Sequence, residues 1–301
     1  MAVARIDLAD AASPERLVLE ILKHEPGLPI PVPIEQLCTQ LDIIEIRPLT
    51  TPGFEGALLT DADKHSGIIL YNQASRPKRR RFTIAHELCH FLAPSHVPDA
   101  EGRFLCSQAD MLLLAASEQD RRRRMEVEAN RFASLLLLPP SVFRRDVDQS
   151  ADPNLQHIIV LSDKYQVSLE AVGRAYVSHR GDPVAIVITE NGRVLRSYRD
   201  GRRFPFITVP DDSPVPSQSL LMRRAHERGV PSEIDETDAG VWIDVQRGRR
   251  APVLYEQVYA QAQGFATIML SLEASEDDEF DPDAERTATE RYRDRQARWR
   301  E

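Results

Sequence analysis

The chain has 301 residues, of which 42% are hydrophobic and 28% are charged. This composition is typical of a soluble globular protein, and the length predicts about two domains. The 38 Lys and Arg residues against 47 Asp and Glu residues give a net charge of −9, which argues against a protein held on nucleic acid mainly by bulk charge.

The cysteines and the apolar runs indicate the compartment. Cys38, Cys89 and Cys106 are too few and too scattered for a disulfide framework, which favours a reducing environment. The N-terminus carries charges where a signal peptide needs an apolar segment, and the longest apolar runs are far shorter than a membrane span. We therefore expect a cytoplasmic protein that has no membrane partner.

Helices and strands are both expected in the first half of the chain. Ser13 and Pro14 are typical of a helix start, and apolar residues follow them at helical spacing. By the same pattern, helices are expected at residues 13–25, 33–41, 78–92 and 117–138. Strands are expected at residues 43–46, 54–60 and 67–72, and the last two predict a β-hairpin because they flank a polar loop.

The second half begins with a polar, turn-rich candidate linker at residues 146–153. Residues 154–178 contain two short amphipathic segments joined by a turn, which is the outline of a helix-turn-helix. Asn191-Gly192 between two strand-like runs then predicts a tight hairpin. Further strands are expected at residues 206–209, 241–245 and 265–272, and the charged residues 275–301 are expected to form a tail or a solvated helix.

The stretch with the clearest chemistry contains the pattern HExxH. His86 and His90 are four residues apart, so a helix places both on one face, where they can bind one metal ion. Glu87 lies beside that ion and can exchange a proton with a water molecule. The alternative is an amphipathic helix with two surface histidines. The apolar neighbours of the motif argue against it, because histidines on a buried helix need partners.

A catalytic zinc needs a third protein ligand, and two glutamates qualify. If Glu126 is the ligand, Asn130 lies one turn further on the same face and can orient a ligand histidine. If Glu128 is the ligand, that pairing is lost, so we favour Glu126. A purely electrostatic role, in which both glutamates balance the basic residues 121–124, stays open from the sequence alone.

Two segments, RRRFTIAHELCHFL and MEVEANRFASLLLLPPSVF, resemble the ImmA/IrrE family of metallopeptidases, and the resemblance covers about residues 13–145. It implies a zincin-like α+β peptidase domain over residues 1–145. In it His86, His90 and Glu126 hold Zn²⁺, with another divalent cation such as Mn²⁺ as an option, and Glu87 is the general acid and base. The family usually has glycine where this chain has Cys89.

The resemblance also implies a substrate and further domains. Members of the family cleave a helix-turn-helix repressor of the XRE type in response to DNA damage or another stress. The longer, radiation-response branch continues with a helix-turn-helix, here residues 146–180, and a β-rich, GAF-like domain, here residues 181–273, before the charged tail at 274–301. The helix-turn-helix carries few basic residues, so we expect packing or protein binding there rather than direct DNA binding.

Three further residues are candidates for binding substrate or stabilising the oxyanion: His65, Tyr71 and His96. No spacing singles out one of them. The strand at residues 67–72 is expected to align an extended substrate, and Cys106 is expected to be a small buried residue. The rival hypothesis is an inactive regulator, in which the metal is structural and the C-terminal domains bind a repressor or DNA.

Overall fold

The computed structural model describes residues 1–51, 53–113, 115–117, 120–245 and 251–273. It confirms a mixed α+β chain. The chain divides into two compact units: the first contains Met1–Phe143 and Val160–Val172, and the second contains Arg144–Ile159 and the described residues from Gly173 onward. The expected tail at residues 274–301 lies outside the described residues.

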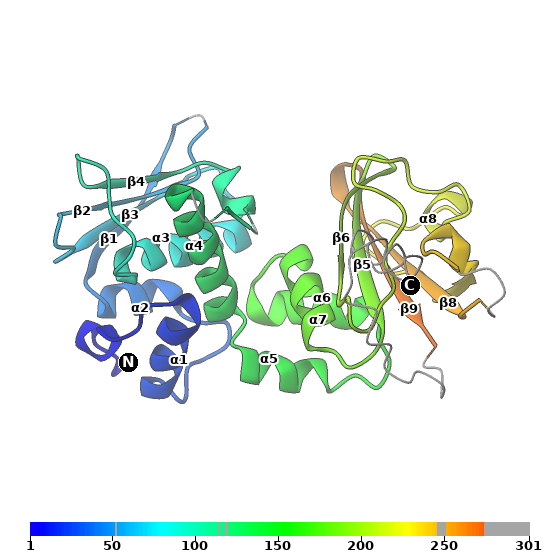
Figure 1. Cartoon of the computed structure of the whole chain (residues 1–301), viewed down its shortest axis with the longest axis horizontal. Coiled ribbons are helices and arrows are strands. Elements are labelled where there is room, and N and C mark those ends of the chain that lie inside the picture. Colours follow the sequence, from blue (N-terminus) through cyan, green and yellow to red (C-terminus); the bar gives the residue numbers. More distant parts are fainter. Residues whose placement is uncertain (52, 114, 118–119, 246–250, 274–301) are drawn as a thin grey trace, which may run out of the picture. The chain divides into compact units, whose positions relative to one another are not determined.

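The first unit is built on a four-stranded sheet (Figure 1). Its strand order is β1-β3-β2-β4, with β1 parallel to β3 and the other neighbours antiparallel. The strands are β1 (Ile43–Leu49), β2 (Gly56–Thr60), β3 (Gly67–Asn72) and β4 (Arg103–Cys106). The predicted hairpin is confirmed as β2–β3. The edge strand β4 falls in a stretch where the sequence predicts no element.

Helices α1 (Pro14–His24) and α2 (Ile34–Gln40) precede the sheet, and α1 begins where predicted because the Ser13 side chain accepts from the Arg16 amide. The long helices α3 (Pro77–Leu92) and α4 (Arg121–Leu137) pack against each other, and α3 also packs against β2 and β3. The residues of α3 from Thr83 to Phe91 are all buried. The HExxH segment therefore lies between the sheet and α4.

Three shorter helices follow. Helix α5 (Pro140–Val147) falls where the sequence predicts no element, and it can begin at Pro140 because proline is well tolerated in a first helical turn. Helices α6 (Leu155–Tyr165) and α7 (Leu169–His179) occupy the predicted positions. Between them Gln166 adopts a positive φ of 53°, and the Ser162 hydroxyl donates to the Val167 carbonyl.

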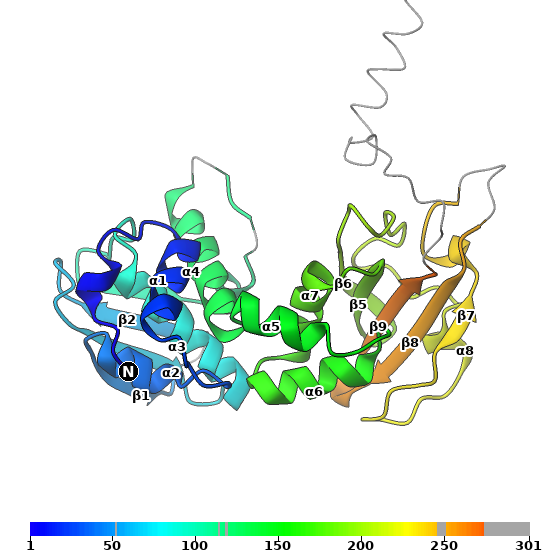
Figure 2. The ribbon, with the colours of Figure 1, turned by 90° about the horizontal axis from the view of Figure 1, so that it is seen from below.

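The second unit contains a five-stranded antiparallel sheet of order β6-β5-β9-β8-β7 (Figure 2). Its strands are β5 (Val184–Glu190), β6 (Arg193–Arg199), β7 (Asp235–Thr237), β8 (Leu254–Ala260) and β9 (Phe265–Leu272). The β5–β6 hairpin turns at Asn191 and Gly192, both with positive φ, as the sequence predicts. The core gathers around the fully buried Trp242. A short helix, α8 (Leu220–Arg223), also belongs to this unit.

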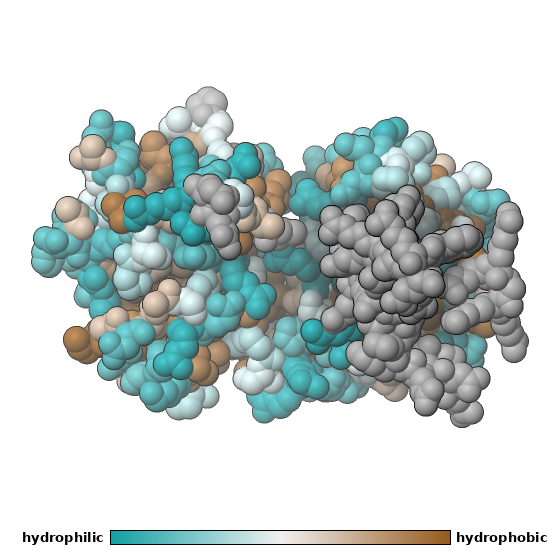
Figure 3. All heavy atoms as spheres, in the orientation of Figure 1, coloured by the Kyte–Doolittle hydropathy of each residue, from teal (hydrophilic) through white to brown (hydrophobic). Residues whose placement is uncertain are grey.

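Two predicted strands of this unit are wrong. Residues 206–209 and 241–245 contribute one isolated bridge, between Ile207 and Ile243, and Ala239–Val241 forms a 3-10 turn. Their apolar residues, Ile207, Trp242 and Ile243, are buried in the core without forming a ladder. Among the described residues, no helix has the length and apolarity to cross a bilayer. On the visible face of the first unit, apolar residues are scattered among polar ones (Figure 3).

Candidate metal centre

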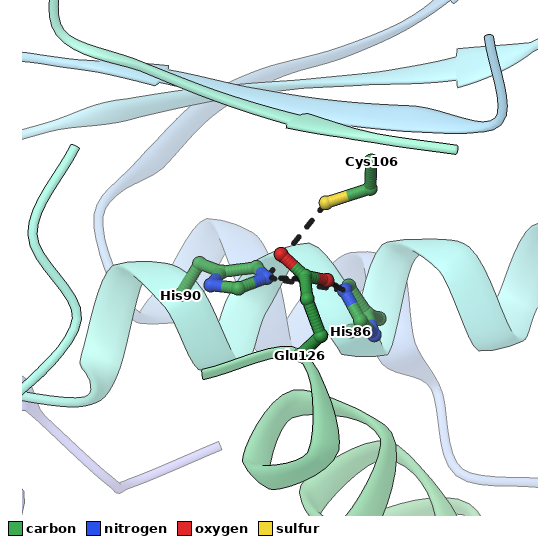
Figure 4. A group of neighbouring side chains, drawn as sticks. All are labelled: His86, His90, Cys106 and Glu126. Carbon is green, nitrogen blue, oxygen red and sulfur yellow. Dashed lines mark hydrogen bonds and ion pairs between the residues drawn. The ribbon is translucent and has the colours of Figure 1, made fainter. Parts of the chain in front are cut away.

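Two helices bring the three predicted ligands together. His86 and His90 lie one turn apart on α3, and Glu126 reaches them from α4 (Figure 4). Glu126 Oε2 lies 3.1 Å from His86 Nε2 and 3.6 Å from His90 Nε2, and the two Nε2 atoms are 3.1 Å apart. Both histidines are fully buried and Glu126 is 4% exposed. The ligand set expected from the sequence therefore converges on one buried point.

Asn130 fixes which nitrogen of His86 carries the proton. The amide nitrogen of Asn130 donates to the carbonyls of Asp110, at 2.9 Å, and Leu113, at 3.0 Å. Its oxygen is thus the atom 2.9 Å from His86 Nδ1, and it can only accept. His86 Nδ1 must therefore be the protonated nitrogen. In the neutral ring, the lone pair of Nε2 then faces Glu126.

A second set of contacts determines which nitrogen of His90 carries the proton. His96 is buried, its Nε2 lies 2.9 Å from Glu128 Oε2, and its Nδ1 lies 3.0 Å from His90 Nδ1. Because the carboxylate accepts, His96 donates through Nε2, and its Nδ1 accepts a hydrogen bond from the protonated Nδ1 of His90. Burial lowers the pKa of His90 to about 4 and that of His96 to about 3, so both rings are neutral at pH 7. The Nε2 lone pair of His90 therefore also faces the cluster.

The resulting arrangement fits a cation. Two imidazole lone pairs 3.1 Å apart cannot hydrogen-bond to each other. Burial by itself would raise the pKa of Glu126, and with lone pairs rather than N–H groups facing its oxygen, a cation is the partner that would keep this group a carboxylate. Ligands about 2.0–2.1 Å from a tetrahedral Zn²⁺ stand about 3.3 Å apart, close to the separations found here. The residues present thus suit a zinc ion.

Glu87 is the polar group without a partner at this site. Its side chain is fully buried, and neither carboxyl oxygen has a hydrogen-bond partner among the described residues that meets normal geometry. Burial raises the pKa of Glu87 well above its usual value. The backbone passes it closely at Gly56, where an added Cβ would lie 2.5 Å from Glu87 Oε1. An unpaired buried carboxyl beside the ligand cluster is suited to exchange a proton with a water molecule.

Cys106, at the end of β4, is a member of the cluster that sequence reasoning missed. Its sulfur lies 3.7 Å from His90 Nε2, and one ligand atom from each of His86, His90, Glu126 and Cys106 lies within 4.8 Å of all the others. Burial raises the pKa of this thiol well above its usual value. The sequence contains no spacing signal for it, because the register of β4 on β2 brings it there.

Of the three remaining candidates, His65 and Tyr71 are not members of the ligand cluster, whereas His96 contacts the ligand His90. His65 is in the β2–β3 loop, where its side chain is 76% exposed and its Nδ1 contacts Asp61. The Tyr71 hydroxyl contacts Arg80 at 3.4 Å. His96 contacts His90 and Glu128 through its two ring nitrogens. The expectation that β3 aligns a substrate is wrong, because β1 and β2 already pair with its two edges.

One comparison, with a protein-family model, agrees with the metallopeptidase resemblance. Residues 44–176 match the family model described as the IrrE N-terminal-like domain, Peptidase_M78. The match starts after α2 and extends into α7, further along the chain than the resemblance noted from the motifs. Among solved structures, a Mycobacterium tuberculosis transcriptional regulator is similar, with 17% identity, 86% of this chain and 87% of that chain covered, and a TM-score of 0.48. No curated protein gives a significant match.

Proposed function

We propose that this chain, which carries an IrrE N-terminal-like domain of the Peptidase_M78 family at residues 44–176, is a metal-dependent endopeptidase that cleaves a helix-turn-helix repressor of the XRE type. The observation that carries the proposal is the fully buried Glu87 carboxyl, which has no hydrogen-bond partner of normal geometry among the described residues, beside two imidazole lone pairs and the Glu126 carboxylate. Burying a carboxyl group without hydrogen-bond partners costs free energy, and such groups with shifted pKa values occur often at active sites.

Metal binding and proton transfer would be carried out by different residues of the site. His86, His90 and Glu126 would hold the ion, with Zn²⁺ preferred over Mn²⁺ because two of the ligands are imidazoles. When bound, the ion would polarise the scissile carbonyl and lower the pKa of a water molecule. Glu87 takes a proton from that water and later gives one to the leaving amine. A raised pKa makes the Glu87 carboxylate a stronger base for the first step, and the resulting carboxyl can still donate its proton to the far more basic leaving amine.

Asn130 and His96 act on the ring nitrogens that face away from the ion. Each holds one ligand histidine in the tautomer that leaves Nε2 free to bind. Asn130 was expected in this role from the sequence. His96 was one of three candidates for binding substrate or stabilising the oxyanion, and its contacts favour the orienting role instead. His65 and Tyr71 stay candidates for substrate contact, although neither belongs to the ligand cluster.

The remaining parts of the proposal concern the rest of the chain. We propose a helix-turn-helix at residues 146–180 that packs or binds protein, supported by α6, α7 and the turn between them. We propose a GAF-like domain at residues 181–273, supported by the five-stranded antiparallel sheet. The substrate and a stress or DNA-damage signal come from the family resemblance. The proposed cytoplasmic location rests instead on the few, scattered cysteines.

The test compares the wild-type chain with Glu87→Gln, each loaded with Zn²⁺. The wild type is incubated with a helix-turn-helix repressor encoded in the same genome, and the products are followed by mass spectrometry. We expect a discrete cut that a chelator abolishes and added Zn²⁺ restores. Glu87→Gln should bind Zn²⁺ with unchanged stoichiometry and cut at least about 100-fold more slowly. Equal cutting by the variant would contradict the role of Glu87.

A second candidate function has one observation in its favour. Four ligand atoms, including the Cys106 sulfur, gather at the site, and a zinc site with four protein ligands is typically structural. The chain would then be a regulator that binds a repressor without cutting it. Stoichiometric repressor binding with no cleavage product, under the conditions of the test above, would favour this function.

A further inference from the structure

We infer that the Cys106 sulfur is the fourth protein ligand of the metal and that it closes the site in the form described here. The inference rests on the metal centre of the proposed function and concerns a residue outside the expected His, His and Glu ligand set. A closed site has no position left for water. Cleavage under the proposed function would therefore require the Cys106 thiolate to leave the ion and give its position to water.

The distances support a shared ion rather than an accidental neighbour. A nitrogen and a sulfur bound to the same tetrahedral Zn²⁺ stand about 3.6 Å apart, given Zn–N of about 2.0–2.1 Å and Zn–S of about 2.3 Å. The distance from Cys106 Sγ to His90 Nε2 is 3.7 Å. In Figure 4 the Cys106 side chain points from the sheet towards the histidines of α3 and Glu126 of α4. The thiol thus approaches from the side that the other three ligands leave uncovered.

The backbone on both sides of Cys106 is held in place. Before it, β4 pairs with β2 so that Cys106 is opposite Gly56, the residue that lies against Glu87. After it, Ser107 donates to the Asp110 carboxylate through its amide, at 2.8 Å, and its hydroxyl, at 2.7 Å. The Asp110 carbonyl in turn accepts from Asn130, which orients His86. The same network therefore positions the thiol and one of the histidines.

Chemistry favours the sulfur once an ion is present. A buried thiol with no cation nearby stays protonated. On binding zinc, it loses its proton to solvent, the sulfur–metal bond forms, and no electron is transferred. The other two cysteines do not belong to the ligand cluster. Cys38 lies on α2, and Cys89 lies on α3 but is not a member of the four-residue cluster. They supply matched controls, because all three thiols are buried.

The experiment uses the full chain loaded with Co²⁺, which replaces Zn²⁺ and gives an absorption band in the near ultraviolet when a thiolate binds it. We expect this band in the wild type, in Cys38→Ser and in Cys89→Ser, and its loss in Cys106→Ser and Cys106→Ala. Chelator competition should show that the two Cys106 variants bind Zn²⁺ at least about tenfold more weakly. A wild-type spectrum without the band, or an unchanged band in Cys106→Ser, would overturn the inference.

X-ray absorption on the wild-type zinc protein provides a measurement that needs no variant to fold. One sulfur neighbour at about 2.3 Å supports the inference, and a shell of nitrogen and oxygen alone refutes it. The outcome is separable from that of the proposed function, because the spectra do not depend on proteolysis. A sulfur ligand without repressor cleavage would leave a closed structural site. Cleavage without a sulfur ligand would leave the peptidase and remove the role of Cys106.

Discussion

Replacing Asn130 tests how far metal affinity depends on the orientation of His86. Asn130 is 5% exposed and makes three hydrogen bonds, one with His86 Nδ1 and two with the carbonyls of Asp110 and Leu113. Asn130→Ala removes all three. Asn130→Asp keeps an acceptor for His86 and removes both donors. The pair therefore separates orientation of the ring from anchoring of the 110–113 segment.

The expected magnitudes follow from these contacts. Losing the outer hydrogen bond of a metal-binding histidine lowers metal affinity about 10–100-fold, or about 1.4–2.7 kcal/mol. Asn130→Ala should show this loss, whereas Asn130→Asp should stay within about threefold of the wild type. Both variants should lower the free energy of unfolding of the metal-free protein by about 2 kcal/mol, because two carbonyls lose a donor.

Competition for Zn²⁺ with a chromophoric chelator measures the affinities, and urea unfolding of the metal-free protein measures the stabilities. The reasoning is refuted if Asn130→Ala binds Zn²⁺ as tightly as the wild type. It is also refuted if Asn130→Asp loses as much affinity as Asn130→Ala, because the retained acceptor would then have no effect on His86.

Two more predictions concern the surroundings of the cluster. The pKa values of His90 and His96 are lowered in the folded protein to about 4 and about 3, whereas these histidines bind protons below about pH 6.5 in the unfolded chain. The metal-free protein should therefore lose stability as the pH falls from about 6.5 towards 4 and 3. The expected loss is up to about 1.4 kcal/mol per pH unit for each histidine. His96→Gln should flatten that slope in urea unfolding at several pH values, and an unchanged slope would contradict the assignment. Gly56→Ala should destabilise the fold by about 1–3 kcal/mol, because the new Cβ would lie 2.5 Å from both Glu87 and Thr83. Gly27→Ala is the control: the space around Gly27 is open, so this variant should change the free energy of unfolding by less than about 1 kcal/mol. Equal thermal shifts for the two variants would show that the close approach at Gly56 is not a constraint.

The sequence was informative wherever one short segment determines the outcome. His86, Glu87 and His90 share one helix, so their relative placement follows from helical geometry alone. Glu126 and Asn130 are likewise four residues apart on α4, which is why the choice of Glu126 over Glu128 could be argued from the orienting amide. Glu128 instead accepts from His96. The relative positions of these side chains were predictable because His86 and His90 belong to one helix and Glu126 and Asn130 to another.

The sequence was uninformative where strands far apart in the chain decide the outcome. Strand β4 has four residues, too few for a period-2 pattern to be recognised, and it exists because it pairs with β2. Cys106 owes its position to that pairing. The interior place of β3 likewise depends on β1 pairing parallel to it, which no hairpin signal reveals. Residues 241–245 show the converse, since apolar residues there are buried without forming a ladder.

The two orienting networks explain why this cluster is prepared for a cation before one arrives. Two imidazole lone pairs and a carboxylate oxygen that lie within 3.6 Å of one another in a buried site repel each other unless a cation lies between them, since like partial charges face each other. The Asn130 amide fixes the orientation of the His86 ring, and the His96–Glu128 pair fixes that of the His90 ring. Protonating His96 would remove the acceptor for His90, so its low pKa is part of the same arrangement. Three ligands are thus set by α3 and α4, and the fourth position is left to the edge strand that ends at Cys106.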